Sequence, residues 1–181
     1  MSTRQIALLV LAAVLMFWTV GAYNRLVALR NAIAEAWAKV DEALRQRRAA
    51  AEPLLAALRE PLAAEQGALD ALQAALGETA AVATTMGAKP VEQTHAVAWV
   101  AAESTLSSAA SRVFALLEQH TELRQQEAVA TNVLAWLEAS KRLRFARQLF
   151  NETATPYDEA IATFPTRLLV RLFRFGSAGR L

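Results

Sequence analysis

Histidine and carboxylate spacing is the first feature of the sequence that could carry chemistry. Helical bundles hold di-metal centres with two Glu-x-x-His motifs and two further inward-facing glutamates. The chain has 2 histidines, and a single stretch, EQTH at residues 92–95, matches the motif. His120 follows Glu118 by two residues, which places their side chains on opposite sides of a helix. We therefore expect no metal ion and no other cofactor. Glu92 is expected to favour a helix dipole instead.

Serine side chains lie close together in one stretch, but none has the setting of a nucleophile. A hydrolase nucleophile sits in a Gly-x-Ser-x-Gly elbow, and phosphate-binding loops are rich in glycine. Neither pattern occurs here, and the absence of cysteine excludes thiolate nucleophiles, cysteine zinc sites and disulfides. We predict a non-enzymatic protein without catalytic residues. The serines, which suit close helix packing, are Ser104, Ser107, Ser108 and Ser111.

The closing stretch FPTRLLVRLFRFGSAGRL, residues 164–181, combines large apolar residues with regularly spaced arginines. Pro165 breaks the chain, and on a helix that follows it Arg167, Arg171 and Arg174 share one face. This pattern is typical of a helix at a membrane surface, where each arginine contributes on the order of 1 kcal/mol near anionic lipid. A cap packed on the base of the protein is the alternative, and the two are compatible. The apolar residues opposite are Leu168, Leu169, Leu172 and Phe175, with Phe173 at the edge.

The other end of the chain holds an uncharged apolar stretch, IALLVLAAVLMFWTVGAY, at residues 6–23. As a helix it would be about 27 Å long, close to the ~30 Å hydrocarbon core of a bilayer. Trp18 and Tyr23 lie toward one end, where amphipathic rings favour the interface, and Arg25 follows as a flanking charge. We predict a single transmembrane helix. A cleaved signal peptide is the rival interpretation, because Val-Gly-Ala at residues 20–22 would suit a cleavage site.

Basic residues on either side of this stretch predict its orientation. The N-terminal side offers Arg4 and the α-amine, whereas the C-terminal side offers Arg25, Arg30, Lys39 and then further arginines. The larger basic cluster stays in the cytoplasm. We therefore expect a short N-terminus, residues 1–5, outside and the domain inside the cell.

Composition predicts an all-α protein with one domain and an anchor. The chain has 181 residues, of which 55% are hydrophobic, with 6 glycines and 5 prolines. Alanine, leucine, glutamate, glutamine and arginine, which are strong helix formers, make up much of the chain. The net charge is +2, from 19 basic and 17 acidic residues, and this balance argues against a general nucleic-acid footprint.

Apolar spacing divides the part after the anchor into four helical segments. The first is expected to stop near Glu52-Pro53, because the residue before a proline avoids helical angles. The others cover residues 53–85, 91–120 and 121–155, with a kink or late start at Pro61. Short links then predict an elongated antiparallel four-helix bundle over residues 24–163, and an even number of helices returns the C-terminus to the membrane. The expected core includes Ile33, Trp37, Val40, Leu44, Trp99, Leu106, Val113, Trp136, Leu143, Phe145 and Phe150.

Two groups of arginines lie outside these apolar stripes. Arg45, Arg47 and Arg48 are expected to end the first helix in solvent, with an interaction patch for an acidic partner as the alternative. A second group on the last helix is expected to pair with acidic residues of the first, which would set register more than stability. This second group is Arg142, Arg144 and Arg147, opposite Glu35, Asp41 or Glu42.

Several stretches resemble LemA family proteins in their order and spacing. They are YNRLVALRNAIAEAWAKVDEALRQRR (23–48), RVFALLEQHTELRQQE (112–127), RLRFARQLFN (142–151) and FPTRLLVRLF (164–173). The resemblance covers nearly the whole chain from residue 6. It implies a bacterial membrane protein with one N-terminal transmembrane helix, a small N-terminus outside and a long antiparallel helical domain. The family offers no agreed catalytic residues to transfer.

The chain departs from the family pattern at several polar positions. Where the family has a run like Ile-Pro-Asn-Leu-Val, residues 52–56 read Glu-Pro-Leu-Leu-Ala. The family's Glu-Asn-Arg is Ser-Lys-Arg at residues 140–142, and its Tyr-Asn is Phe150-Asn151. A binding role shared by those positions would be lost or changed here.

Together these features predict a membrane-anchored scaffold or adaptor at the bacterial cytoplasmic (inner) membrane, with lipid around the anchor and an unidentified protein partner. The alternative is a module that organises the membrane or envelope through lipid contact by the basic C-terminal segment. No nucleic-acid partner is expected, and a homo-oligomer is compatible with the sequence. The candidate membrane-interface residues are Trp18, Tyr23, Arg25, Arg167, Leu168, Arg171, Leu172, Phe173 and Arg174.

Overall fold

The protein is all-helical over the residues that its computed structural model describes, which are 2–164, 166–173 and 175–181, with the backbone alone at 169, 171 and 172. This confirms the predicted fold class. The elements in chain order are α1 (Thr3–Leu58), the short 3₁₀ helix η1 (Ala63–Glu65), α2 (Gln66–Ala88), α3 (Gln93–Gln119), α4 (Thr121–Arg124), α5 (Glu127–Ala162) and α6 (Thr166–Phe173).

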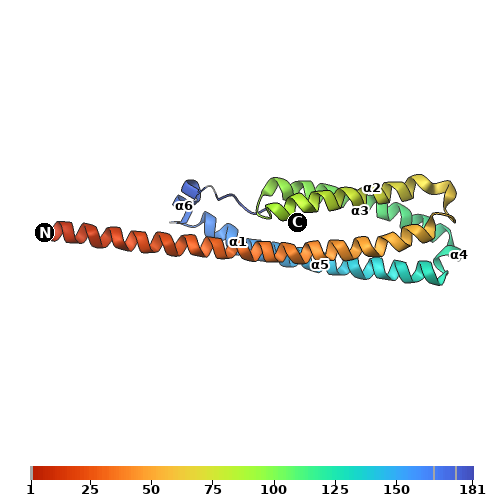
Figure 1. Ribbon diagram of the computed structural model, residues 1–181, viewed down its shortest axis with the longest axis horizontal. Helices are drawn as coiled ribbons and strands as arrows, with labels where there is room; N and C mark the ends of the chain where they lie inside the picture. The colour runs from red at the N-terminus through yellow and green to blue at the C-terminus, as the bar shows by residue number, and fades with distance from the viewer. Residues whose placement is uncertain (1, 165, 174) are drawn as a thin grey trace.

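Helix α1 is one continuous helix that joins the apolar stretch to the bundle (Figure 1). Its 56 residues correspond to about 84 Å. The predicted end near Glu52-Pro53 was wrong, because Pro53 lies inside α1. Leu54, Leu55 and Leu58 continue the buried stripe beyond the proline. Their burial outweighs the lost backbone hydrogen bond.

The reversal after α1 therefore comes later than expected. Residues 59–65, with Pro61 among them, make the turn, and α2 begins at Gln66 rather than at Pro53. Leu62 is buried beneath this turn. The next turn follows the sequence signal closely, since α2 ends at Ala88 and α3 begins at Gln93.

The helices form two antiparallel pairs that lie against each other. Helix α5 runs alongside α1, and α3 runs alongside α2, while α1 also contacts α2. Figure 1 shows the α2–α3 pair stacked on the α1–α5 pair, with the start of α1 projecting beyond both. The result is the predicted elongated antiparallel four-helix bundle. Its end nearest the projecting part of α1 is called the base here.

The core consists of two apolar clusters separated by a polar layer. The cluster near the base contains Trp37, whose ring meets those of Trp99 and Phe150 edge to face, with centroids 6.2 Å apart in each case. The distal cluster contains Leu72, Leu106 and Trp136, among other residues. Between them lie the two buried polar residues of the described chain, Arg47 and Thr79, together with Glu103. Most expected core residues are buried, but Phe145 was wrongly assigned, because its side chain is 70% exposed.

Candidate membrane-proximal site

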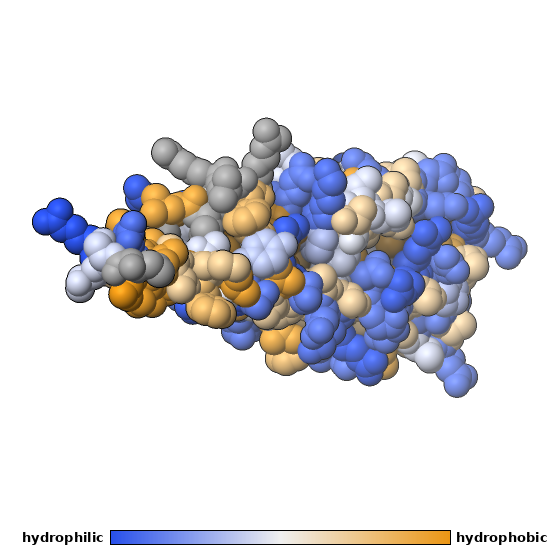
Figure 2. All heavy atoms as spheres, turned by 60° about the vertical axis from the view of Figure 1, so that its left-hand side comes forward, coloured by the Kyte–Doolittle hydropathy of each residue, from blue (hydrophilic) through white to orange (hydrophobic). Residues whose placement is uncertain are grey.

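The projecting part of α1 is apolar and uncovered. It is long and apolar enough to cross a membrane, and none of that window is buried within the protein. Met16 and Phe17, for example, are 68% and 77% exposed. Figure 2 shows orange side chains gathered at the end of the molecule where α1 begins, whereas much of the remaining face is blue. This long apolar N-terminal helix suggests a membrane anchor.

The candidate interface residues on α1 lie where the helix approaches the bundle. Trp18 is partly exposed, Tyr23 is 39% exposed, and Arg25 is exposed. The first fully buried residue of α1 is Leu26. These three side chains therefore mark the boundary between the uncovered part of α1 and its packed part.

Helix α6 lies beside this boundary. The ring centroids of Tyr23 and Phe173 are 5.1 Å apart, and those of Tyr23 and Phe175 are 6.2 Å apart, so α6 is fastened to α1 by aromatic contacts. Arg167 is exposed, and Leu168 and Phe173 are 61% and 45% exposed. The helix is thus docked on the base and still presents apolar side chains. Of the remaining candidates, Arg174 lies outside the described residues, as do the side chains of Arg171 and Leu172.

After α6 the chain does not continue as a basic helix but folds back. Residues 175–181, called the tail here, have no regular secondary structure and lie against the bundle. Phe175 and Ala178 are buried in the core cluster near the base. The Tyr157 hydroxyl donates to the carbonyl oxygen of Gly176 at 2.8 Å. The tail thus packs on the base, which was one of the two interpretations of the closing segment, but it does so without a helix.

Burial of Tyr157 has an electrostatic consequence. Its side chain is fully covered, and this burial raises the pKa of its hydroxyl above the ordinary value. The nearby Arg30 guanidinium opposes the rise in pKa, and Asp158 adds to it. The guanidinium of Arg30 also lies 5.4 Å from the centre of the Phe175 ring. The hydroxyl therefore stays protonated and remains a hydrogen-bond donor to the tail.

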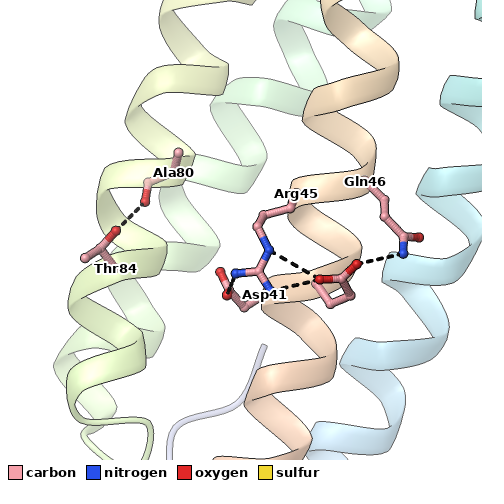
Figure 3. Close-up of polar contacts among 6 residues, drawn as sticks. Asp41, Arg45, Gln46, Ala80 and Thr84 are labelled. Carbon is pink, nitrogen blue, oxygen red and sulfur yellow. Dashed lines mark hydrogen bonds and ion pairs between the residues drawn. The ribbon is translucent and has the colours of Figure 1, made fainter.

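A hollow with a volume of about 420 Å³ lies between α1 and α2. Its floor is apolar and includes Trp37 and Leu76, and its rim carries Asp41 and Arg45. Figure 3 shows Arg45 bonded to its α1 neighbours at this rim, with Gln46 on the side of α1 that faces α5. Arg45 donates to Asp41 and also to Glu42 at 2.9 Å. The hydrogen bonds that Glu42 accepts from Arg45 and from Gln46 lower the pKa of its carboxyl.

The expected solvated helix end at these arginines was wrong. Helix α1 continues past them, and Arg47 is buried rather than exposed. Its guanidinium makes two hydrogen bonds to Glu103 of α3, at 2.6 and 2.7 Å, and lies 5.6 Å from the centre of the Trp136 ring. Arg48 pairs with Glu52 of the same helix at 3.5 Å. The arginines of this group are thus largely paired within the protein.

The arginines of α5 also differ from expectation. Arg142 pairs with Glu138 on its own helix at 3.4 Å and reaches α1 at Gln46 rather than at an acidic residue. Arg147 lies with its guanidinium 5.1 Å from the centre of the Trp99 ring. It therefore contacts an aromatic face where an ion pair was predicted.

The histidine, carboxylate and serine side chains that were considered for chemistry do not come together at one site in the part of the chain that the structure describes. Glu92 caps α3 in extended conformation and pairs with Lys89 at 3.3 Å. No group of three or more His, Asp or Glu side chains among the described residues could hold a metal ion. Ser104 and Ser108 form a hydrogen bond along α3, from the Ser108 hydroxyl to the Ser104 carbonyl oxygen.

Comparison with known proteins gives one match. The model of the LemA family matches residues 36–180, which is well over half of the chain. A search of curated proteins finds no match. The matched range includes most of the packed part of α1, then α2, α3, α4, α5 and α6, and most of the tail. The chain belongs to the LemA family.

Proposed function

We propose that this protein is a non-enzymatic, single-pass scaffold that holds a protein partner near the cytoplasmic membrane. The observation that carries the proposal is the continuity of α1, which passes from an uncovered apolar segment into the bundle without a break. A continuous helix fixes the direction of the bundle relative to its anchor. Such an arrangement suits a rod that presents its sides at a set distance from the bilayer.

An apolar surface on α5 supports a protein partner. Leu134, Leu137 and Phe145, called the α5 outer stripe here, are 67%, 46% and 70% exposed. They lie roughly 25 to 40 Å along α5 from its end at the base, beyond the reach of lipid. Exposed apolar groups of this size favour burial against another protein.

Site-specific photo-crosslinking in cells tests this proposal. A photoreactive phenylalanine analogue is placed at Leu134 or Phe145, and Val97 of α3, which is 63% exposed, serves as the matched control. We expect one discrete adduct from both α5 positions and none from Val97. No adduct from α5, or the same adducts from all three positions, would contradict a partner surface on this helix.

A second candidate function, contact of α6 with membrane lipid, is supported by a separate observation. Helix α6 keeps Leu168 and Phe173 partly exposed beside the boundary at Tyr23, which favours a module that works by lipid contact. The chain has no cysteine, so Leu168→Cys carries a single environment-sensitive fluorophore. In nanodiscs, lipid contact predicts quenching by brominated lipid that is stronger with anionic than with neutral lipid. An unquenched fluorophore, equal to one placed at the exposed Ser177, would count against lipid contact.

The orientation is part of the proposal. We place the N-terminus outside and the bundle in the cytoplasm, on the basis of the arginines and lysine that follow the apolar segment. Partners of the α5 outer stripe are then cytoplasmic proteins.

A further inference from the structure

The tail occupies a groove between α5 and α3 at the base of the bundle. The backbones of these two helices are not closely packed in the described chain. Their side chains meet at Trp99 and Arg147, and on the base side of that contact the tail lies between the two helices. Phe175, Ala178 and Gly179 of the tail point inward and are buried, whereas Gly176, Ser177 and Arg180 are exposed. The tail therefore lies in the groove as an extended peptide.

Side chains of α5 hold the backbone of this peptide. Asn151 is bonded to both backbone groups of Leu181: its amide nitrogen donates to the carbonyl oxygen at 2.8 Å, and its oxygen accepts from the N–H at 2.9 Å. Asp158 accepts from the N–H of Ala178 at 2.8 Å, and Tyr157 donates to Gly176. A bidentate amide offers a peptide the same donor and acceptor pair that a neighbouring strand would offer. The groove thus recognises extended backbone.

Two contacts add sequence preference. A Cβ atom at Gly179 would lie 2.1 Å from the Cβ of Ala96 and 3.3 Å from the Cα of Gln93, so this position accepts glycine alone. The next residue, Arg180, makes an ion pair with Asp158 at 2.8 Å. The groove therefore favours a glycine followed by a basic residue.

The groove is larger than its occupant. A hollow of about 470 Å³ lies at the Phe175 end of the tail, lined also by Arg30 and Lys89. Another of about 470 Å³ lies at the Leu181 end, lined also by Arg144 and Arg147 of α5. Apart from the bond of the Phe175 N–H to the Val170 carbonyl oxygen of α6, at 3.1 Å, no backbone–backbone hydrogen bond holds the tail among the described residues. These features suit a bound segment that can be exchanged.

We infer that this groove is a binding site for an extended peptide of a partner protein, one that carries glycine followed by a basic residue, and that the tail is its built-in competitor. The tail is tethered beside the groove, which gives it an effective concentration in the millimolar range. A partner segment must therefore bind more tightly than the tail or arrive after the tail has left. The site is separate from the α5 outer stripe and goes beyond the proposed scaffold function.

Two glycine substitutions in the full chain separate tail release from general damage. Gly179→Ala introduces the clash with Ala96, whereas Gly176→Ala meets nothing within 4 Å and serves as the matched control. The probe is a fluorescein-labelled peptide, FGSAGRL, added to each full-length protein in nanodiscs and followed by anisotropy. We expect the Gly179→Ala protein to bind the probe at least about tenfold more tightly than wild type, because the competing tail is gone. The Gly176→Ala protein should behave as wild type, and a probe with alanine in place of its second glycine should not bind.

A second measurement shows whether the tail has left. Ala178→Cys is buried at 7% exposure, so its rate of maleimide labelling reports release in otherwise cysteine-free proteins. Labelling should be slow in wild type and with Gly176→Ala, and fast with Gly179→Ala. If the Gly179→Ala protein is labelled fast but does not bind the peptide, the proposal of a peptide-binding site is overturned. If this protein is labelled slowly, the proposed role of Gly179 is overturned. Equal probe affinity in wild type and Gly179→Ala overturns the competition. If the wild-type protein forms a dimer and Gly179→Ala abolishes it, the groove is occupied by the tail of a second copy. That result would overturn the assignment to a partner protein.

Discussion

At the scale of single residues, the polar layer has the largest energetic consequence. Arg47 and Glu103 join α1 to α3 where the two apolar clusters meet, and their side chains are 7% and 12% exposed. Thr79 of α2 lies in the same layer and donates to the Ala75 carbonyl oxygen at 2.8 Å. A buried charge pair tolerates few alternative positions of one helix pair along the other. We infer that the layer fixes the register between the α1–α5 pair and the α2–α3 pair.

Removing one partner of this pair should be costly. Glu103→Ala leaves the Arg47 guanidinium buried without its carboxylate, and we expect a loss of about 3 to 5 kcal/mol in the free energy of unfolding. Glu138→Ala, which breaks the exposed pair with Arg142, is the control and should cost less than about 1 kcal/mol. Denaturant unfolding in detergent measures both values. Equal losses in the free energy of unfolding for the two variants would contradict the larger contribution of the buried pair to stability.

Tyr157 predicts a specific dependence on pH. Because burial raises its pKa, the folded state holds the hydroxyl proton more tightly than the unfolded state. Its contribution to stability is complete below the unfolded pKa of about 10 and is lost as pH rises through the folded pKa. Tyr157→Phe should cost about 1 kcal/mol at neutral pH, since it removes the hydrogen bond to Gly176. Unfolding curves measured from pH 7 to 11 should show this gap shrink above pH 10, and a constant gap would contradict the assignment.

At this scale the sequence predicts the core well and its exceptions badly. Trp37, Trp99 and Phe150 each belong to an apolar stripe of helical spacing on their own helix, and each is buried as expected. Arg47 was expected in solvent but is buried, and Phe145 was expected in the core but is exposed. Periodicity assigns a residue to a face of its helix, but it does not show whether a partner covers that face. Glu103 lies on another helix, 56 residues away, so no local pattern could have indicated the pair.

At the scale of elements, the end of α1 shows how burial overrides a local signal. Pro53 cannot donate a backbone hydrogen bond, yet three buried leucines hold the last turn of the helix together. The end of α2 and both ends of α3 lie within a few residues of the predicted positions. The predicted end of the last helix at residue 155 was wrong, because α5 continues to Ala162 with Pro156 inside it. A cap on the base was one of the two interpretations of the closing segment, but the path of the tail was not predicted. Its partners on α5, which are Asn151, Thr155 and Asp158, have the sequence pattern of ordinary solvent-facing residues. Their spacing of four and three on a single face, opposite a glycine-rich segment, is the signal that was present.

Replacing Pro53 should therefore stabilise the protein. Pro53→Ala restores a donor inside α1 without changing the buried stripe, and we expect a gain of about 1 to 3 kcal/mol. Pro61→Ala is the control, since Pro61 lies in the turn between α1 and η1. Thermal unfolding in detergent compares the two. A destabilising effect of Pro53→Ala would mean that the proline sets a bend that the packing of Leu54 and Leu58 requires.

At the scale of the whole molecule, two antiparallel helix pairs form a rod. Its base carries both the uncovered apolar segment of α1 and the groove that the tail fills. Four amphipathic segments with short links predict the antiparallel order and the return of the C-terminus toward the apolar stretch. Which helices pair closely does not follow from the segments, because each has an apolar stripe that fits more than one neighbour. The structure pairs α1 with α5 and α2 with α3, and this pairing opens the groove that the tail fills.

The central claim is that α1 crosses the membrane and continues as the first helix of the bundle. It is tested most directly by labelling single cysteines at the two ends of the chain, Ser2→Cys and Ser177→Cys, both at exposed positions. A membrane-impermeant maleimide is applied to intact cells stripped of any outer barrier and again after lysis. We predict that Cys at position 2 is labelled before lysis and Cys at position 177 only after it. Labelling of both before lysis, or of neither, would contradict a membrane-spanning α1.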